Sequence, residues 1–292
     1  MCVSPKLTDL DLKSIDTVAV DLETYDPDLK TKGSGAVRGN GFVCGIAIAT
    51  SKQTLYFPLK HVMTDNIPRK KAWDYLNKKL FQNPNIKKVF HNAMYDVCWI
   101  RAESGLMPHG PLLDTMVAAS VIDENRMRYS LDALSKDYLK ESKYKYDLQE
   151  KTLEWSQGTI KDPMTNMHNL SYDLVKDYAE QDVNLTLKLW NLFNARLDQE
   201  EKVEKDTRNE KTKTLRHIFE LETRLFPCLV DMKFKGVRFD IESAEKLGKR
   251  LKKTKTNIID YIKRRTGVKI EIWAAASIKK LLDKLKITDY TS

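Results

Sequence analysis

Alternating apolar and polar positions in the first third of the chain predict strands. Residues 17–24 (TVAVDLET) alternate and are rich in β-branched side chains, which is typical of a buried strand. Residues 42–50, 54–59 and 86–92 show similar apolar runs between loop segments. A glycine-containing loop (residues 25–41) separates the first two predicted strands.

Helical spacing of apolar positions dominates the rest of the chain. The segment 68–82 begins with a proline and places Trp73, Leu76 and Leu80 on one side, as an amphipathic helix does. The same periodicity predicts helices at 93–103, 112–122, 130–139, 170–197, 212–235, 241–265 and 277–286. Strands followed by helices indicate an α/β domain with a central sheet and helices around it.

A polar segment without aromatic residues, 200–214, separates two apolar-periodic regions. We interpret it as an exposed helix or connector at a domain junction. The predicted domains are therefore residues 1–200, which contain the strands, and residues 201–292, which are helical.

All of the excess positive charge lies in the second predicted domain. The 292 residues include 50 Lys and Arg against 41 Asp and Glu, a net charge of +9. Residues 201–292 hold 24 basic and 14 acidic residues, a net charge of +10, which leaves −1 for residues 1–200. This distribution predicts a polyanionic partner, most simply nucleic acid, although lysine-rich helices can also be solvated surfaces.

Composition excludes several classes of protein. With 41% hydrophobic and 31% charged residues, the chain is globular rather than disordered. It has no apolar stretch of membrane-spanning length, and its first residues do not resemble a secretion signal. Its four cysteines form no CxxC pair, so we expect reduced thiols in a cytoplasmic protein without a disulfide framework or zinc cage.

Acidic residues at three points of the chain are candidate metal ligands. Asp21 and Glu23 are two positions apart on a strand, so their side chains share one face. Two carboxylates in a dry environment repel each other, and a divalent cation such as magnesium or manganese relieves that repulsion. Asp96 falls in the first turn of a helix, and Tyr178 and Asp182 share a helix face. Each pattern alone also fits ordinary surface residues.

In their order along the chain, these residues resemble the three motifs of the DEDD exonucleases, tyrosine subclass: Asp21-x-Glu23, Asn92-x-x-x-Asp96 and Tyr178-x-x-x-Asp182. The similarity extends to bacteriophage family A (polymerase I-type) DNA polymerases. It covers most of the chain, in the segments 25–50, 112–116, 128–139, 219–240 and 273–287.

This resemblance implies a ribonuclease H-like (DnaQ-like) fold with a mixed central sheet flanked by helices. Residues 201–292 would form a mostly helical region similar to the beginning of the polymerase domain. The polymerase motifs that bind nucleotides and carry the catalytic aspartates do not occur in the 292 residues, so we expect no nucleotide polymerisation. The chain looks like the front part of a polymerase, with a C-terminal half as a missing partner.

The function implied by the resemblance is 3′–5′ DNA exonuclease activity with two divalent cations, Mg²⁺ or Mn²⁺, for proofreading during phage DNA replication. Asp21, Glu23 and Asp182 would hold the cation that activates water. Asp21 would bridge to the second cation, and Asp96 would hold that one largely through water. Tyr178 would orient the attacking water, because a phenol is a poor base near neutral pH.

The resemblance also implies contacts with nucleic acid. Asn92, Tyr95 and Thr24 would contact the terminal nucleotides, and Arg128 would lie near the phosphates. The expected substrates are single-stranded or frayed DNA 3′ ends, with primer–template duplex bound by the basic C-terminal region. For a phage-encoded protein, the expected location is the cytoplasm of the infected cell, without a membrane.

Two other functions remain open at the level of sequence. One is an RNA-processing exonuclease similar to ribonuclease D, which shares the tyrosine-type motifs. The other is a non-catalytic DNA-binding module with the exonuclease fold. The polymerase-like segment 214–240 favours the DNA polymerase interpretation over the first of these.

Overall fold

The computed structural model describes residues 4–142, 145–207 and 214–287. The chain divides into two compact units, Met1–Lys235 and Gly236–Ser292. This division reflects how compactly each unit is folded, and it does not assign a function to either unit. The predicted boundary at residue 200, between an exonuclease domain and a polymerase-like region, stays a prediction.

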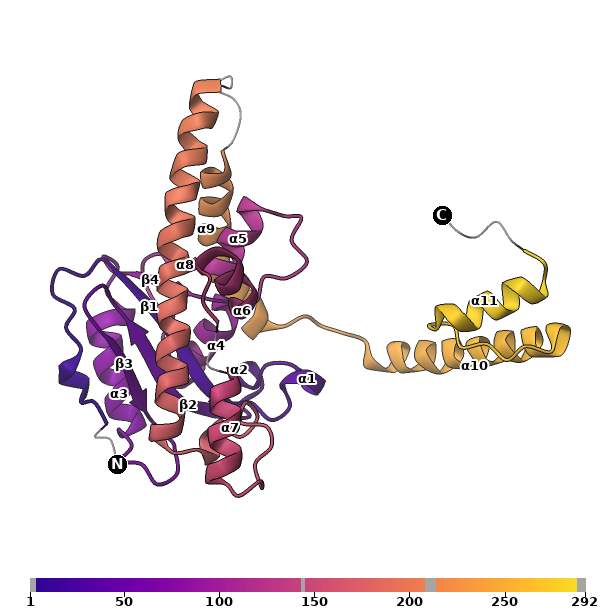
Figure 1. The fold of residues 1–292 in the computed structure, drawn as a ribbon, viewed down its shortest axis with the longest axis horizontal. Helices are drawn as coiled ribbons and strands as arrows, with labels where there is room; N and C mark the ends of the chain where they lie inside the picture. Colours follow the sequence, from indigo (N-terminus) through magenta and orange to yellow (C-terminus); the bar gives the residue numbers. More distant parts are fainter. Residues whose placement is uncertain (1–3, 143–144, 208–213, 288–292) are drawn as a thin grey trace. The chain divides into compact units, whose positions relative to one another are not determined.

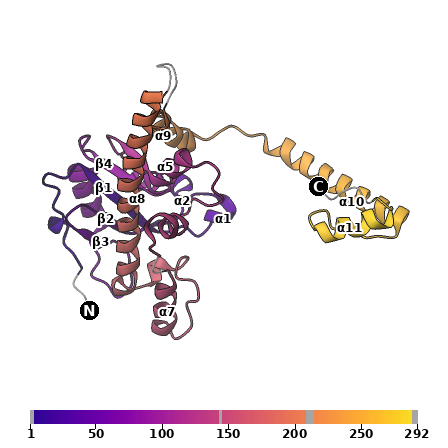
Figure 2. The same ribbon diagram turned by 45° about the horizontal axis from the view of Figure 1, so that its top comes forward.

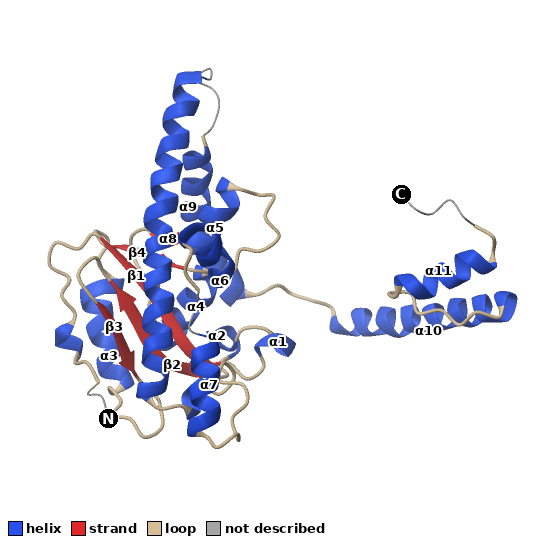
Figure 3. Ribbon diagram, viewed as in Figure 1, coloured by secondary structure: helices blue, strands red, loops and turns tan. Residues whose placement is uncertain are grey.

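A mixed five-stranded sheet lies at the centre of the first unit, in the order β3-β2-β1-β4-β5 (Figure 3). Strand β1 pairs antiparallel with β2 and parallel with β4, while β2–β3 is antiparallel and β4–β5 is parallel. The strands are β1 (Thr17–Tyr25), β2 (Phe42–Ala49), β3 (Thr54–Pro58), β4 (Lys87–Phe90) and β5 (Leu112–Asp114).

Strand β5 corrects the helix predicted over 112–122. The segment Leu112–Asp114 pairs with β4, and only Thr115–Ile122 is helical. The apolar run LLDTMVAASVI has no clear period over its first residues, so a three-residue strand cannot be told there from the start of a helix.

Helices surround this sheet (Figure 1). In the first unit they are α1 (Leu29–Lys32), α2 (Gly35–Arg38), α3 (Arg69–Leu76), α4 (Ala93–Ser104), α5 (Thr115–Ile122), α6 (Leu131–Leu134), α7 (Lys145–Trp155), α8 (Tyr172–Thr207) and α9 (Leu215–Lys235). Shorter 3₁₀ and π-helical turns are η1 (Leu7–Asp9), η2 (Asn77–Phe81), η3 (Ser135–Leu139) and η4 (Met167–Asn169). The sequence pattern did not predict α1, α2 or α7. In the predicted connector 200–214, α8 continues to Thr207, and residues 208–213 lie outside the described part.

Both faces of the sheet are buried, by different helices. Val18, Val20 and Leu22 of β1 belong to one apolar core, which they share with residues of α3 and α4. The alternate residue Ala19 belongs to the second core, on the face that α8 crosses (Figures 1 and 2). Because side chains alternate along a strand, Asp21 and Glu23 lie on the same face as Ala19, toward α8.

The second unit contains two amphipathic helices, α10 (Ile241–Thr266) and α11 (Ala275–Lys284). Asp240 caps α10 by accepting a hydrogen bond from Ser243 N at 2.9 Å. Gly267 ends the helix in the left-handed conformation, with φ of +73°.

Two predictions from composition concern membrane-spanning helices and the state of the cysteines. Among the helices in the described ranges, none combines the length and the apolar character needed to cross a bilayer. Cys44, Cys98 and Cys228 are free thiols, as expected, and Cys2 lies outside the described residues.

Candidate active site

The acidic pair of β1 lies where the pairing with β2 is irregular. Asp21 is opposite Ala47 and Glu23 opposite Gly45, and the register then shifts between Glu23 and Thr24. Glu23 is 8% exposed, although it carries a carboxylate. Such a shift twists a strand and re-aims its side chains, which is common next to active sites.

A buried tyrosine forms one wall beside Glu23. The ring of Tyr56 lies directly over Gly45, where a Cβ atom would come within 2.1 Å of the phenol oxygen. Burial, and next the charge of Glu23, raise the pKa of Tyr56 well above its ordinary value. Its hydroxyl shares a 2.7 Å hydrogen bond with His61 Nε2, so the phenol is held in a fixed position. Position 45 therefore requires glycine.

Asp96 reaches β1 from the first turn of α4. Its Oδ1 accepts a hydrogen bond from Leu22 N at 3.1 Å, and the residue is 3% exposed. This contact places the Asp96 carboxylate beside the strand segment that carries Asp21 and Glu23. Burial, and next the charge of Asp21, raise the pKa of Asp96 well above its ordinary value.

Tyr178 and Asp182 face the same patch from α8. The two residues are 7% and 3% exposed and stand one helical turn apart. Burial raises the pKa of Tyr178 well above its ordinary value, and the charges of Asp182, Glu23 and Asp21 add to this effect. The phenol is therefore protonated at neutral pH. Asp96 thus contacts β1 directly, and the charges of Asp21, Glu23 and Asp182 act together on the Tyr178 phenol.

The turn into α4 is held by a further buried carboxylate, Asp114. Asn92 adopts the left-handed conformation, with φ of +68°, which is uncommon for a residue other than glycine. Asp114 accepts hydrogen bonds from Asn92 N at 3.0 Å and Ala93 N at 2.7 Å. It also caps α5 by accepting from Met116 N at 2.8 Å. One side chain therefore holds the first turns of two helices together.

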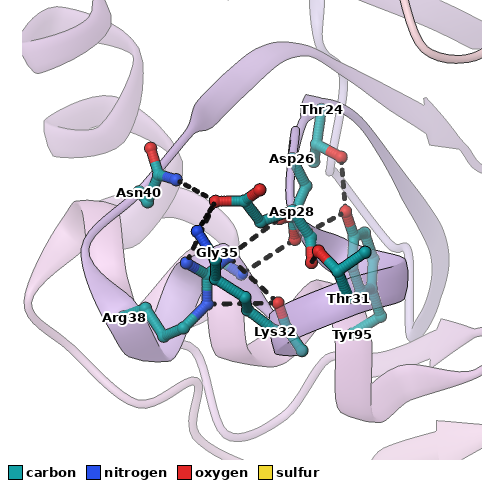
Figure 4. A network of polar contacts seen from close by, with 10 residues as sticks. Thr24, Asp26, Asp28, Thr31, Lys32, Gly35, Arg38, Asn40 and Tyr95 are labelled. Atoms are coloured by element: carbon teal, nitrogen blue, oxygen red, sulfur yellow. Dashed lines mark hydrogen bonds and ion pairs between the residues drawn. The ribbon is translucent and has the colours of Figure 1, made fainter.

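Thr24 and Tyr95 meet through their hydroxyl groups, which share a 2.6 Å hydrogen bond (Figure 4). The Tyr95 hydroxyl also donates to Asp26 Oδ2 at 3.4 Å, and burial raises the pKa of Tyr95 to about 12. Asp26 in turn accepts a hydrogen bond from Gly35 N at 2.9 Å. The loop between β1 and β2 is thereby tied to α4. In the same network, Arg38 Nη1 from this loop lies 3.7 Å from Asp28 Oδ2.

Arg128 is the residue predicted to lie near the phosphates. It is exposed in the segment between α5 and α6. The nearby Arg126, and not Arg128, pairs with Asp137 and lies over the ring of Tyr138. The structure therefore gives Arg128 a solvent-facing position.

The donor set at this patch suits a hard cation. Asp21, Glu23, Asp96 and Asp182 offer only carboxylate oxygens, the ligands that magnesium and manganese prefer. Burial, and next the charge of Asp21, raise the pKa of Asp96, and a divalent cation would relieve the cost of that buried charge. Over the described ranges, however, no three His, Cys, Asp or Glu side chains already form a metal-holding group. The type of ligand therefore suits a divalent cation, but in the described part of the chain these side chains are not arranged as a preformed metal-binding group.

Comparison with known families decides what kind of protein carries this patch. The family model described as 3′–5′ exonuclease matches residues 7–198, a stretch that includes Asp21, Glu23, Asp96, Tyr178 and Asp182. The chain belongs to this exonuclease family. The chain is 30% identical to DNA polymerase DpoZ of Acinetobacter phage SH-Ab 15497 over 215 residues, which are 73% of this chain and 32% of that polymerase.

These matches confirm the resemblance to the exonuclease portion of phage DNA polymerases. The chain spans about a third of the length of the curated relatives that it matches. NrnC of Brucella melitensis with bound Mg²⁺ has a TM-score of 0.52 at 18% identity, over 80% of this chain and 92% of that chain. The POL domain of Pol1 from M. smegmatis, in complex with DNA primer-template and dNTP, has a TM-score of 0.54 at 15% identity, over 92% of this chain and 37% of that chain. At these identities the likeness concerns the fold, and the predicted ribonuclease H-like fold is confirmed.

The sequence interpretation missed Asp114, Asp26 and Tyr56. Asp114 lay inside a predicted helix, where an N-cap is not expected. The pair Asp-Thr ahead of the apolar run was the signal for a cap. Asp26 and Tyr56 had no local signal, because their partners lie in other elements.

We predict that Asp114 stabilises the first unit mainly by holding α4. Asp114→Ala leaves one buried and two partly buried N–H groups without their acceptor, so the free energy of unfolding should fall by about 3 kcal/mol. Asp114→Ser keeps the cap on Met116 N but is too short to reach α4, and it should recover only part of this loss. Urea denaturation measures both variants. Equal stability of Asp114→Ser and the wild type would show that the bonds to α4 contribute nothing.

Proposed function

We propose that this chain is a divalent-cation-dependent 3′–5′ exonuclease of the tyrosine-type DEDD class. It removes nucleotides from single-stranded or frayed DNA 3′ ends, as the proofreading part of a phage DNA polymerase. The observation that carries the proposal is the 3.1 Å hydrogen bond between Leu22 N and Asp96 Oδ1. This bond joins the carboxylate of the second motif, Asp96, to the strand that carries the first motif, Asp21 and Glu23. The family match supports the exonuclease activity, and the phage polymerase relatives support DNA as the substrate.

Four carboxylates would hold the cations, Mg²⁺ or Mn²⁺: those of Asp21, Glu23, Asp96 and Asp182. When bound, a pair of divalent cations supplies an activated water and neutralises charge on the phosphate and on the departing 3′ oxygen. The protein's own contribution is to keep these acids together in a largely buried patch, where an anion alone would be costly.

Tyr178 would position the attacking water. Its raised pKa keeps the phenol protonated, so the hydroxyl can donate a hydrogen bond but cannot serve as a base at neutral pH. Its place one turn before Asp182 supports a role beside a carboxylate that holds a cation.

Binding of the DNA end would involve the elements next to the carboxylates. Asn92, Thr24 and Tyr95 would contact the terminal nucleotides, and the exposed Arg128 would bind a phosphate. The hydrogen bond between Thr24 and Tyr95 supports a shared role, because it links the end of β1 to α4.

The basic second region would bind primer–template duplex. Lys246, Lys249, Arg250 and Lys253 of α10 recur at spacings of three and four, which places them on one helix face. Residues 1–200 as an exonuclease domain, and residues 201–292 as the beginning of a polymerase domain, complete the proposed organisation.

Removal of the acidic pair of β1 tests the proposed activity. In Asp21→Ala/Glu23→Ala, degradation of 5′-labelled single-stranded DNA should fall by about 1,000-fold or more, because the several kcal/mol supplied by bound cations would be lost. Binding of the same DNA should persist. The control Asp74→Ala removes an exposed acid of α3 that pairs with Lys70 and should keep full activity.

Three results would change the proposal. Hydrolysis that survives in the double variant would disprove the site. Wild-type protein that never degrades DNA with Mg²⁺ or Mn²⁺, yet binds it, would be a binding module. Faster degradation of the matching RNA strand would indicate the ribonuclease D-like alternative.

Replacement of Tyr178 by Phe separates water positioning from substrate binding. Tyr178→Phe should lower kcat by about 100-fold, since a misplaced nucleophile costs about that much, while KM stays within a factor of about two. The pH–rate profile between pH 6 and 9 should keep its shape, because the wild-type phenol does not ionise there. Loss of a basic limb in the variant would show instead that Tyr178 acts as a base.

Salt dependence tests the proposed duplex-binding face. Changing Lys246, Lys249, Arg250 and Lys253 to Gln removes four positive charges, so the slope of log K for duplex DNA against log salt should flatten by about 3 to 4. The matched control changes Lys70, Lys71, Lys78 and Lys79, four exposed lysines of α3 and η2, to Gln. If both sets flatten the slope equally, the α10 face has no special role.

A further inference from the structure

A glycine lies directly opposite Glu23 in the sheet. The antiparallel pairing of β1 with β2 places Gly45 across from Glu23. Side chains of such a pair project from the same face of the sheet, with Cβ atoms about 5 Å apart. Because glycine has no side chain, this register alone would leave an open space beside Glu23 on the β2 side. Asp96 comes from the opposite side of β1, since α4 follows β4.

The phenol of Tyr56 fills this space. A Cβ atom on Gly45 would come within 2.1 Å of the Tyr56 hydroxyl oxygen and within 2.3 Å of its Cζ. Tyr56 is fully buried and pairs with Ala47 of β2, which is itself opposite Asp21. The ring therefore leans from the row of Asp21 onto the row of Glu23. Its phenol takes the place that a side chain at position 45 would have, next to Glu23.

The hydroxyl of Tyr56 is held by His61, whose tautomer follows from its other partner. His61 Nδ1 lies 2.9 Å from the carbonyl oxygen of Leu170, which can only accept, so Nδ1 carries the proton. Burial lowers the pKa of His61 to about 4, so the ring is neutral at neutral pH and its Nε2 is an acceptor. The Tyr56 hydroxyl therefore donates the 2.7 Å hydrogen bond to Nε2.

Two further contacts fix this pair in place. Asn66 binds the backbone of His61 twice, because its Oδ1 accepts from His61 N and its Nδ2 donates to His61 O, both at 2.8 Å. The ring of Tyr172, the first residue of α8, stacks on Tyr56 with centroids 6.1 Å apart and an interplanar angle of 9°. Thr64 Oγ1 accepts from Tyr172 N at 2.9 Å. The loop after β3 thus anchors the tyrosine and the beginning of the helix that carries the third motif.

A buried hydroxyl–imidazole pair is an expensive way to fill an apolar space. Each of its polar atoms needs a hydrogen-bond partner, whereas a phenylalanine ring would need none. The Tyr56 hydroxyl and both nitrogens of His61 have such partners. Fully satisfied buried networks impose one rigid arrangement on the side chains around them. In this protein that rigidity is located beside Glu23.

We propose that Tyr56, locked by His61, is a positioning residue for Glu23. Its phenol closes the β2 side of the Glu23 side chain, so the carboxylate is directed toward α8 and Asp96, where a divalent cation would be held. A ligand that is already oriented loses less conformational freedom when the cation binds, which raises the affinity. This inference rests on the proposed function, since it concerns a ligand of that site. Tyr56 acts through Glu23 and contacts neither the cation nor the DNA.

Binding of Mn²⁺ to the full-length protein without DNA, followed by electron paramagnetic resonance of the free ion, tests this role. The Mn²⁺ that the wild type binds and Asp21→Ala/Glu23→Ala does not bind defines the site. Tyr56→Leu removes the phenol and should raise the Kd of that Mn²⁺ by about 10-fold or more, as loss of a group that orients a metal ligand does. Tyr56→Phe keeps the ring over Gly45 but frees it from His61, so it should raise the Kd by less.

Phe57→Leu is the matched control. Phe57 is the next residue of β3, is fully buried and belongs to the core on the opposite face of the sheet. Its replacement also removes a ring from the core and lowers stability, but it should leave the Kd of Mn²⁺ unchanged. An equal rise of the Kd in Phe57→Leu and Tyr56→Leu would overturn the proposal, as would an unchanged Kd in Tyr56→Leu.

Substitutions of His61 keep the proposal testable if Tyr56→Leu does not fold. His61→Leu removes the acceptor for the Tyr56 hydroxyl and should raise the Kd of Mn²⁺. His61→Gln should recover part of the affinity, because its amide offers both an acceptor and a donor. A wild-type Kd in His61→Leu would overturn the proposal. In kinetics, excess Mn²⁺ should restore kcat of these variants while KM for DNA stays unchanged, and a raised KM would show that the pair acts on the substrate instead.

Failure of this inference differs from failure of the proposed function. If wild-type protein degrades DNA but Tyr56→Leu binds Mn²⁺ as tightly as the wild type, the exonuclease proposal stands and the positioning role is wrong. If wild-type protein binds Mn²⁺ at the site without degrading DNA, and Tyr56→Leu weakens that binding, the positioning role stands and the hydrolytic function is wrong.

Discussion

Electrostatic repulsion between carboxylates in a poorly solvated patch is the constraint on which the rest of the first unit depends. Asp96 lies against β1 with its pKa raised by burial and by Asp21, and the field of three acids reaches the Tyr178 phenol. Buried like charges are unfavourable, and proteins keep them together when a site needs them. The hydrogen bond from Leu22 N is the local compensation that the fold supplies.

The surrounding elements hold this unfavourable arrangement in place. Asp114 fixes the left-handed turn at Asn92 and so determines where the first turn of α4 points. Gly45 leaves room for the Tyr56 ring beside Glu23. Such positions store strain or buried polarity that the bulk of the apolar core must offset. Gly45 lies on β2, and Asn92 directly precedes α4.

The two parts of the chain differ in charge in a way that fits the proposed chemistry. Residues 1–200 have a net charge of −1 and residues 201–292 a net charge of +10. A patch of carboxylates repels a polyanion, so attraction for DNA has to come from elsewhere in the protein. The basic helix α10 of the second unit offers such attraction.

Local periodicity in the sequence determined much of the secondary structure of this protein and the faces on which its acidic residues lie. One alternating segment and three apolar runs predicted four of the strands. The alternation put Asp21 and Glu23 on one face, and helical spacing put Tyr178 and Asp182 on one helix face. Only the tertiary structure decided that Asp96, 74 residues from Leu22, binds its backbone, because that contact depends on the parallel pairing of β1 with β4. It likewise decided that Asp114 belongs to a strand and that Tyr56 lies over Gly45. A sequence pattern reports neighbours within a strand or a helical turn, whereas these contacts join distant segments that approach only when the sheet order is set.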